Sequence, residues 1–247
     1  MILPRREDAK HKNQLFRLLR EVLGNKKLAN NLMFKGGTYA ALLGVLDRFS
    51  IDLDFDMPDI TALDTVREEC HKIFKKLDLE VKDESKNHLQ FFLRYPAPVN
   101  ERNTLKLEIN DTPSKFNVYE SKNLLEINMY CKGHSLDTMF ANKFVAAKAR
   151  YDKTGKIAGR DFYDLHKFFE QGFSVNTKVI KDLTGMSYTQ YLHVMKDFIL
   201  KNVTRQVLLE DLNPLLRPEE FKRITPILID ELLMYISDDI RREDEVK

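Results

Sequence analysis

Two aspartates, Asp52 and Asp54, lie two residues apart in a segment, residues 49–56, where apolar and polar residues alternate strictly. This alternation predicts a half-buried strand, on which side chains two residues apart point to the same side. Neighbouring like charges are unfavourable without a compensating cation, and carboxylate oxygens are ligands that Mg²⁺ or Mn²⁺ accepts. The pair therefore predicts a divalent metal site. The alternative is a solvated acidic face that guards a sheet edge, and Asp56 fits that description.

A glycine motif, Lys35-Gly-Gly-Thr38, comes before this strand, with fourteen residues from Thr38 to Asp52. Gly36 and Gly37 allow the backbone to approach a phosphate closely, and the N–H groups of a following helix would point at it. Thr38 adds a hydroxyl donor. Alone, such a motif is more often a tight turn or a helix cap. Followed by a helix and then by the paired aspartates, it predicts a turn that binds nucleotide phosphates.

Nucleotidyl transfer needs fixed donors for a triphosphate and carboxylates that hold divalent ions. A third carboxylate would complete a site for two metal ions, and Glu108 is the candidate because it lies on the polar face of a strand predicted over residues 105–110. The alternative is an ordinary exposed glutamate between Lys106 and Asn110.

Four charged residues form a second group further along the chain. Lys143 and Arg150 share one face of a predicted helix, and Asp161 and Asp164 share a face of the next helix. From the residues alone, surface ion pairs explain these charges. The functional alternative is that Lys143 and Arg150 neutralise a triphosphate, while Asp161 fixes the lysine or joins the metal site.

The elements that position these residues divide the chain in two. Up to Cys131 the pattern mixes helices with strands, and beyond it almost only helical patterns occur. We therefore predict an α+β fold, with a mixed sheet flanked by helices over residues 1–131 and a helical bundle over 132–247 that contributes to the active-site cleft. Strands are expected over 49–56, 89–95, 105–110 and 124–130, and helices over 7–23, 39–46, 61–77, 136–151, 161–170, 188–201, 203–212 and 218–237.

Composition and charge are those of a globular protein. Hydrophobic residues make up 43% of the 247 residues, which is enough for a core, and 40 Lys plus Arg against 38 Asp plus Glu leave a net charge of +2. That balance neither requires nor excludes a nucleic-acid partner. The two cysteines, without a Cys-x-x-Cys pair, fit a reducing compartment and exclude a cysteine-based zinc site. Without a signal-like start or a long apolar run, a cytoplasmic protein with no membrane partner is expected.

Taken together, these motifs resemble the AbiEii-type nucleotidyltransferase toxins of type IV toxin–antitoxin and abortive-infection systems, a branch of the DNA polymerase beta-like superfamily. The resemblance covers roughly residues 30–170 and implies an N-terminal nucleotidyltransferase fold. The matching segments, in order, are Phe34–Leu43, Arg48–Phe55, Leu105–Ile109, Ala141–Arg150 and Arg160–Leu165.

The resemblance also implies roles for single residues. It implies that the glycine motif binds nucleotide phosphates, that the paired aspartates bind metal, and that Lys143 and Asp161 are needed for activity. It further implies an NTP substrate and a separate antitoxin protein. We assign Asp52, Asp54, Lys143 and Asp161 to catalysis, Lys35, Gly36, Gly37, Thr38, Lys143 and Arg150 to nucleotide binding, and Asp52, Asp54 and Glu108 to Mg²⁺ or Mn²⁺.

The function predicted is metal-dependent transfer of NMP from an NTP to an acceptor hydroxyl, and the resemblance implies RNA, in particular the 3′ end of tRNA, as the acceptor. A protein or a small molecule such as an aminoglycoside is an alternative acceptor, because the same site could use any hydroxyl. Two non-catalytic alternatives also remain open. One is a nucleotide- or RNA-binding module without turnover, and the other is a scaffold whose helical half binds a partner. Lys196, Lys201 and Arg205 are consistent either with a basic face for RNA or with solvated charge.

Overall fold

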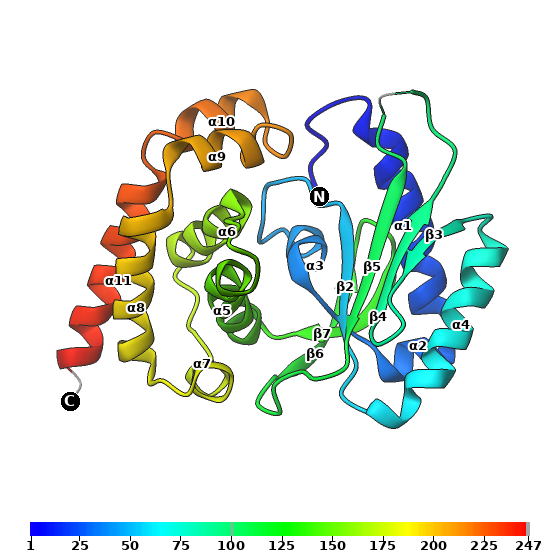
Figure 1. Cartoon of the computed structure of the whole chain (residues 1–247), viewed down its shortest axis with the longest axis horizontal. Helices are drawn as coiled ribbons and strands as arrows, with labels where there is room; N and C mark the ends of the chain where they lie inside the picture. Colours follow the sequence, from blue (N-terminus) through cyan, green and yellow to red (C-terminus); the bar gives the residue numbers. More distant parts are fainter. Residues whose placement is uncertain (100, 246–247) are drawn as a thin grey trace. The chain divides into compact units, whose positions relative to one another are not determined.

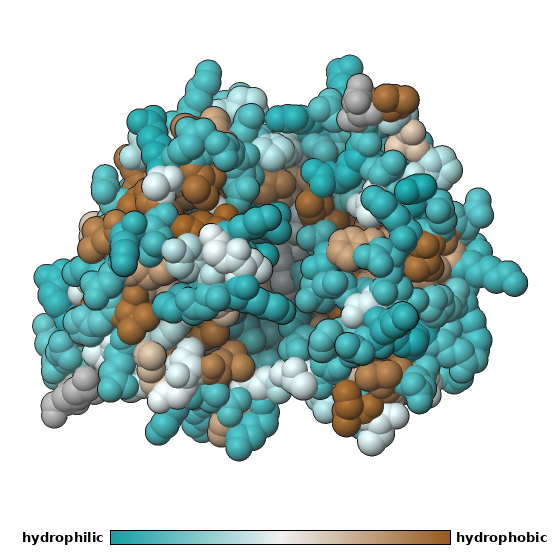
Figure 2. Space-filling view, in the orientation of Figure 1, coloured by the Kyte–Doolittle hydropathy of each residue, from teal (hydrophilic) through white to brown (hydrophobic). Residues whose placement is uncertain are grey.

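The computed structural model describes residues 1–99 and 101–245. The chain divides into two compact units, Met1–His134 and Ser135–Lys247. In Figure 1 the first unit contains the sheet with its helices, and the second unit is built from helices. On the face shown in Figure 2, hydrophilic residues cover most of each unit, and apolar residues appear as separate patches. In the part of the chain that is described, no helix is long and apolar enough to span a bilayer.

The first unit is organised around a mixed seven-stranded sheet with the order β3-β4-β5-β2-β1-β7-β6. Its central pair, β2 and β5, is parallel, as are β1 and β7, whereas the other neighbouring strands are antiparallel. The strands are β1 (Met33–Lys35), β2 (Asp52–Asp56), β3 (Glu80–Glu84), β4 (Leu89–Arg94), β5 (Thr104–Asn110), β6 (Tyr119–Leu124) and β7 (Met129–His134).

Helices pack on this sheet because one side of each central strand is apolar. Leu53 and Phe55 of β2 are fully buried, and the Phe55 ring stacks on Phe34 of β1 with ring centroids 4.8 Å apart. Helix α1 contributes a buried apolar stripe that contains Leu15 and Leu19, at the helical spacing that the sequence shows. The helical segments of this unit are α1 (Asp8–Gly24), α2 (Lys26–Asn31), α3 (Gly36–Leu42), the 3₁₀ turn η1 (Ile60–Ala62) and α4 (Leu63–Lys76).

The second unit is a helical bundle with an aromatic core. Helix α6 contacts α5, α9 and α11, and α8 contacts α7 and α11. Phe140, Phe144 and Phe168 are fully buried at the centre of the packing. The predicted α+β fold with a C-terminal helical part is therefore confirmed. The helices are α5 (Leu136–Thr154), α6 (Gly159–Glu170), α7 (Thr177–Thr184), α8 (Tyr188–Asn202), α9 (Arg205–Leu212), α10 (Pro218–Ile224) and α11 (Leu228–Glu245).

Three predicted elements differ from the structure. The strand expected over 124–130 is wrong, because β6 ends at Leu124 and β7 begins at Met129, with Asn128 in the left-handed region at φ 51°. The single helix expected over 218–237 is two helices, because Pro226 between them has no N–H to continue the first. The helix expected over 39–46 begins earlier, at Gly36, so the glycine motif is its first turn rather than a loop before it.

Candidate active site

The carboxylates predicted to bind metal meet on one face of the central strand pair. In the parallel register of β2 and β5, Asp54 lies opposite Glu108, and Asp52 lies opposite Lys106. Register partners in adjacent strands share a face, and side chains two residues apart share it as well. The structure therefore brings Asp52, Asp54 and Glu108 together on the face opposite to the buried Leu53 and Phe55.

The pKa values of Asp54 and Glu108 are shifted in opposite directions. Burial, together with the negative charges of Asp52 and Glu108, raises the pKa of Asp54 to about 6. Burial also acts to raise the pKa of Glu108, but Lys106, which pairs with its carboxylate, brings the pKa below its usual value. Of these two carboxylates, Asp54 is therefore the one whose negative charge a bound cation would stabilise more.

The side chains are not gathered around one point. Within residues 1–99 and 101–245, no three His, Cys, Asp or Glu side chains are already arranged as a set of metal ligands. Glu108 pairs with Lys106 of its own strand. The donor chemistry nevertheless suits a hard divalent ion, because Mg²⁺ and Mn²⁺ prefer oxygen ligands and the three carboxylates share one face of the sheet.

The glycine motif lies directly beside the paired aspartates. Gly36 has φ 77°, and a Cβ atom there would overlap the Asp54 carboxylate. A Cβ atom at Gly37 would lie 2.5 Å from the guanidinium of Arg48, which is buried. Both glycines are thus required by the close approach of neighbouring side chains.

Thr38 is fully buried, and its hydroxyl faces the protein. Its Oγ1 contacts Ser50 Oγ at 2.9 Å and donates to the backbone oxygen of Asp52 at 2.5 Å. The hydroxyl therefore ties helix α3 to the start of β2, at the first of the paired aspartates. Sequence reasoning expected this hydroxyl to point at a phosphate.

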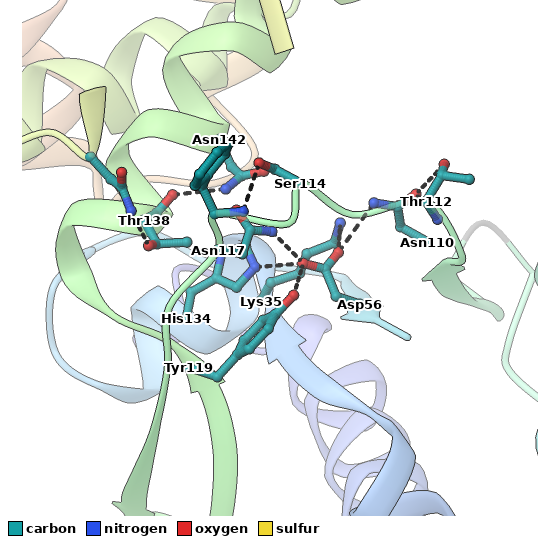
Figure 3. A network of polar contacts seen from close by, with 12 residues as sticks. Lys35, Asp56, Asn110, Thr112, Ser114, Asn117, Tyr119, His134, Thr138 and Asn142 are labelled. Carbon is teal, nitrogen blue, oxygen red and sulfur yellow. Dashed lines mark hydrogen bonds and ion pairs between the residues drawn. The ribbon is translucent and has the colours of Figure 1, made fainter. Parts of the chain in front are cut away.

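Asp56 is not the solvated edge residue that the alternation suggested. It is fully buried, and it sits at the centre of a polar network (Figure 3). The donors come from four strands and a loop: Lys35 Nζ at 2.5 Å, His134 Nε2 at 2.8 Å, Asn117 Nδ2 at 2.9 Å, Tyr119 Oη at 3.1 Å and Asn110 Nδ2 at 3.2 Å.

The network keeps Asp56 ionised. Burial alone would raise the pKa of Asp56, but the hydrogen bond from His134 and the charge of Lys35 outweigh it and hold the pKa well below its usual value. Burial lowers the pKa of His134, whose Nε2 lies 2.8 Å from Asp56 Oδ2. Lys35, predicted to bind nucleotide, thus has its ammonium group on Asp56. No sequence spacing links these partners, and the motif analysis missed them.

The second charged group forms between helices α5 and α6. Lys143 Nζ lies 3.2 Å from Asp161 Oδ1 and 3.0 Å from Asp164 Oδ2, and Arg150 Nε lies 3.0 Å from the other oxygen of Asp161. Both aspartates are buried, so these are not the exposed surface pairs that the residues alone suggested. Burial acts to raise the pKa of Asp161, but Lys143 and Arg150 hold it below its usual value.

Comparisons with known proteins identify the family of this chain. The family model described as nucleotidyl transferase AbiEii toxin, type IV TA system, matches residues 17–242. No curated protein matches the chain.

Several solved structures share the fold. A candidate nucleotidyltransferase from Helicobacter pylori is 18% identical, with TM-score 0.60, over 98% of this chain and 99% of that chain. JHP933, also from Helicobacter pylori, is 20% identical, with TM-score 0.57, over 96% of each chain. MenT4, a nucleotidyltransferase toxin from Mycobacterium tuberculosis, is 18% identical, with TM-score 0.53, over 96% of this chain and 87% of that chain.

The family match covers most of both units and includes the glycine motif, the paired aspartates and the lysine–aspartate group. This chain therefore belongs to the AbiEii nucleotidyltransferase toxin family, and it is a nucleotidyltransferase.

Proposed function

We propose that this nucleotidyltransferase moves NMP from an NTP to the 3′ hydroxyl of an RNA, with tRNA as the preferred class of acceptor, and that it depends on Mg²⁺ or Mn²⁺. The observation that carries the metal dependence is the register of β2 and β5. This register places Asp54 opposite Glu108 on one face, with the pKa of Asp54 raised to about 6. A carboxylate in that state gains stability from a cation.

Asp52 and Asp54 are the proposed metal ligands, and Glu108 is the third once it turns away from Lys106. A divalent ion held there would stabilise negative charge on the attacking and leaving oxygens. In the reaction, the acceptor hydroxyl attacks the α-phosphorus in line, its proton leaves to solvent, and the bond to the bridging oxygen breaks to release pyrophosphate.

The remaining residues of the motifs bind and orient the nucleotide. We assign the backbone N–H groups of Gly36 and Gly37, which begin helix α3, to the phosphates, because the start of a helix favours an anion. Thr38 fixes β2 through its hydroxyl bond to Asp52. In the second unit, Lys143 and Arg150 are proposed to neutralise the triphosphate, with Asp161 holding both cations in place.

Labelled NTPs test the reaction and the acceptor together. Wild-type protein incubated with total RNA and a divalent ion is expected to label RNA, whereas Asp54→Asn is expected to lose at least a hundredfold in rate, in line with the loss of a group that stabilises transition-state charge. Asp64→Asn, which removes an exposed carboxylate in α4, is the matched control and is expected to retain full rate.

The acceptor class has its own readout. Mass spectrometry of tRNA from cells that express the wild type is expected to show added nucleotides at the 3′ end, absent with Asp54→Asn. Label on cell protein instead of RNA would replace the RNA acceptor with a protein one. No pyrophosphate release with any acceptor would favour a binding module without turnover.

The family also provides for a protein partner. Type IV toxin–antitoxin systems pair a toxin with a separate antitoxin. We propose that such a protein counteracts this enzyme, so its co-expression should restore the growth of cells that make the wild type.

A further inference from the structure

Two carboxylates, those of Asp54 and Asp56, lie on the strand that pairs with the strand of Lys35. In the antiparallel register of β1 and β2, Lys35 stands directly opposite Asp54, and Met33 stands opposite Asp56. Directly opposite residues share a face of the sheet, so the lysine stem begins beside Asp54. Its ammonium nevertheless lies on the neighbouring carboxylate, 2.5 Å from Asp56 Oδ1. The ammonium of the residue opposite the proposed metal ligand is thus held by a different carboxylate.

We propose that Asp56 is a positioning residue that holds the Lys35 ammonium away from Asp54 and thereby keeps the Asp54 carboxylate available for a divalent cation. This inference rests on the metal site proposed above. It assigns to Lys35 and Asp56 a role in metal affinity rather than a direct contact with the nucleotide.

The geometry gives Asp56 the means to hold the lysine. Besides Lys35, four side chains form hydrogen bonds with the Asp56 carboxylate and fix its position: Asn110, Asn117, Tyr119 and His134. Figure 3 shows these side chains converging on Asp56 from the strands and loop around it. A carboxylate fixed in this way, in a buried setting, attracts one ammonium strongly, because the effective dielectric constant is far below that of water.

Losing the carboxylate should move the cation. Lys35 is only 20% exposed, so its ammonium has few solvent contacts to replace Asp56. The opposite Asp54 is the carboxylate that its register provides. An ion pair there would occupy carboxylate oxygens and repel an incoming Mg²⁺ or Mn²⁺. Removing Asp56 alone should therefore weaken metal binding, and removing Lys35 as well should restore it.

Direct Mn²⁺ binding, followed by electron paramagnetic resonance without nucleotide, tests this reasoning. Asp56→Asn is expected to bind Mn²⁺ roughly tenfold more weakly than the wild type, which is the scale of one nearby charge in a partly buried site. The double variant Lys35→Met with Asp56→Asn is expected to return to within about threefold of the wild type. Tyr130→Phe changes an exposed side chain of β7 that lies outside this network, so its Mn²⁺ affinity should not change.

Each outcome separates the two proposals. If Asp54→Asn binds Mn²⁺ like the wild type, the metal site is wrong and the inference fails with it. If Asp54→Asn loses binding but Asp56→Asn does not, only the inference fails. If the double variant stays as weak as Asp56→Asn, Asp56 acts through the fold alone, and the inference is again overturned.

Wild-type protein offers a second measurement that does not depend on the folding of any variant. Acetylation of Lys35 by an amine-directed reagent, read by mass spectrometry, is expected to be slow and equal with and without Mn²⁺, because the lysine stays on Asp56. Faster acetylation on addition of Mn²⁺ would mean that the metal displaces Lys35 from Asp54, which contradicts the proposal.

Discussion

Two features favour glycine at position 36, namely the positive φ of its backbone and the closeness of the Asp54 side chain. Gly36 and Gly44 each have φ 77°, where an L side chain is strained, but a Cβ atom at Gly36 would overlap Asp54, whereas one at Gly44 would meet no atom within 4 Å. We predict that Gly36→Ala and Gly44→Ala each lose about 1 kcal/mol from the backbone, with a further loss at Gly36. Urea unfolding measures this difference.

Activity separates the two glycines further. Gly36→Ala displaces a proposed metal ligand, so nucleotidyl transfer should fall at least tenfold, whereas Gly44→Ala should transfer at the wild-type rate. Equal activity of both variants would show that Asp54 does not need the space that Gly36 leaves.

His11 couples the stability of the first unit to pH. Burial lowers the pKa of His11 from 6.5 to about 4, and the neutral ring contacts Tyr95 Oη at 2.8 Å and Ile51 O at 2.9 Å. Between pH 6.5 and 4 the unfolded chain binds a proton that the folded chain does not. The free energy of unfolding should therefore fall as the pH drops through this window, by up to about 3 kcal/mol.

The comparison with His11→Gln isolates this contribution. The amide can still donate to Ile51 O but does not titrate, so the variant should be less stable than the wild type at pH 7 and lose less stability on acidification. Chemical unfolding at pH 7, 6, 5 and 4 measures both slopes. Parallel curves for the two proteins would exclude His11 as the titrating group.

The strands that carry the candidate metal ligands could be predicted because their apolar and polar residues alternate. This alternation is a property of the local sequence, and it indicates that one face of each strand is apolar. That pattern gave β2 and β5, and with them the common face of Asp52 and Asp54. It failed for Asp56, which shares their spacing but is buried. The donors to Asp56 come from β1, β5, β6, β7 and a loop, and no local pattern encodes such distant pairing.

Strand β3 and the turn between β6 and β7 could not be predicted, because local sequence does not determine them. All five residues of β3 are polar or exposed, so its pairing with β4 leaves no apolar stripe in the sequence. The turn between β6 and β7 has an alternation of apolar and polar residues over Leu125–Met129, and for this reason the sequence predicts a strand over 124–130, where the structure has the turn. Local propensity could not reveal either, because tertiary pairing decides both.

Lys143 of α5 forms two ion pairs with buried aspartates of α6. Lys143 pairs with both Asp161 and Asp164, which are buried, whereas Arg150 pairs with Asp161 and is 42% exposed. We predict that Lys143→Met destabilises the protein by about 3 kcal/mol, because two buried carboxylates lose a shared cation. Arg150→Met should cost at most about 1 kcal/mol.

Urea unfolding with the same probe for both variants checks this difference. A further variant, Lys143→Met with Asp164→Asn, should recover part of the stability, because one buried negative charge is removed together with the cation. Equal losses for Lys143→Met and Arg150→Met would mean that the lysine is not the residue that stabilises this helix pair.

The whole molecule combines two separately built groups. The glycine motif and carboxylates lie within Met1–His134, and the lysine–aspartate group lies within Ser135–Lys247. The family match includes both, since it extends over residues 17–242. The order of motifs could be predicted from the sequence because each motif is local, but the burial of Asp161 and Asp164 depends on how whole helices pack.

The class of acceptor should determine how strongly the reaction depends on salt concentration. The chain has a net charge of only +2, so overall charge gives RNA little attraction, and any phosphate contacts must come from local groups of Lys and Arg. If about three phosphates of a single-stranded 3′ end are contacted, RNA binding should weaken about 20-fold between roughly 50 and 200 mM salt. We therefore expect the KM for RNA to rise by that factor while kcat at saturating RNA stays within about twofold.

Steady-state transfer measured at fixed free Mg²⁺ and saturating NTP gives both constants, and pyrophosphate release with a non-RNA acceptor serves as the control for general salt effects. A KM for RNA that does not change with salt would argue against phosphate contacts and in favour of an uncharged or protein acceptor.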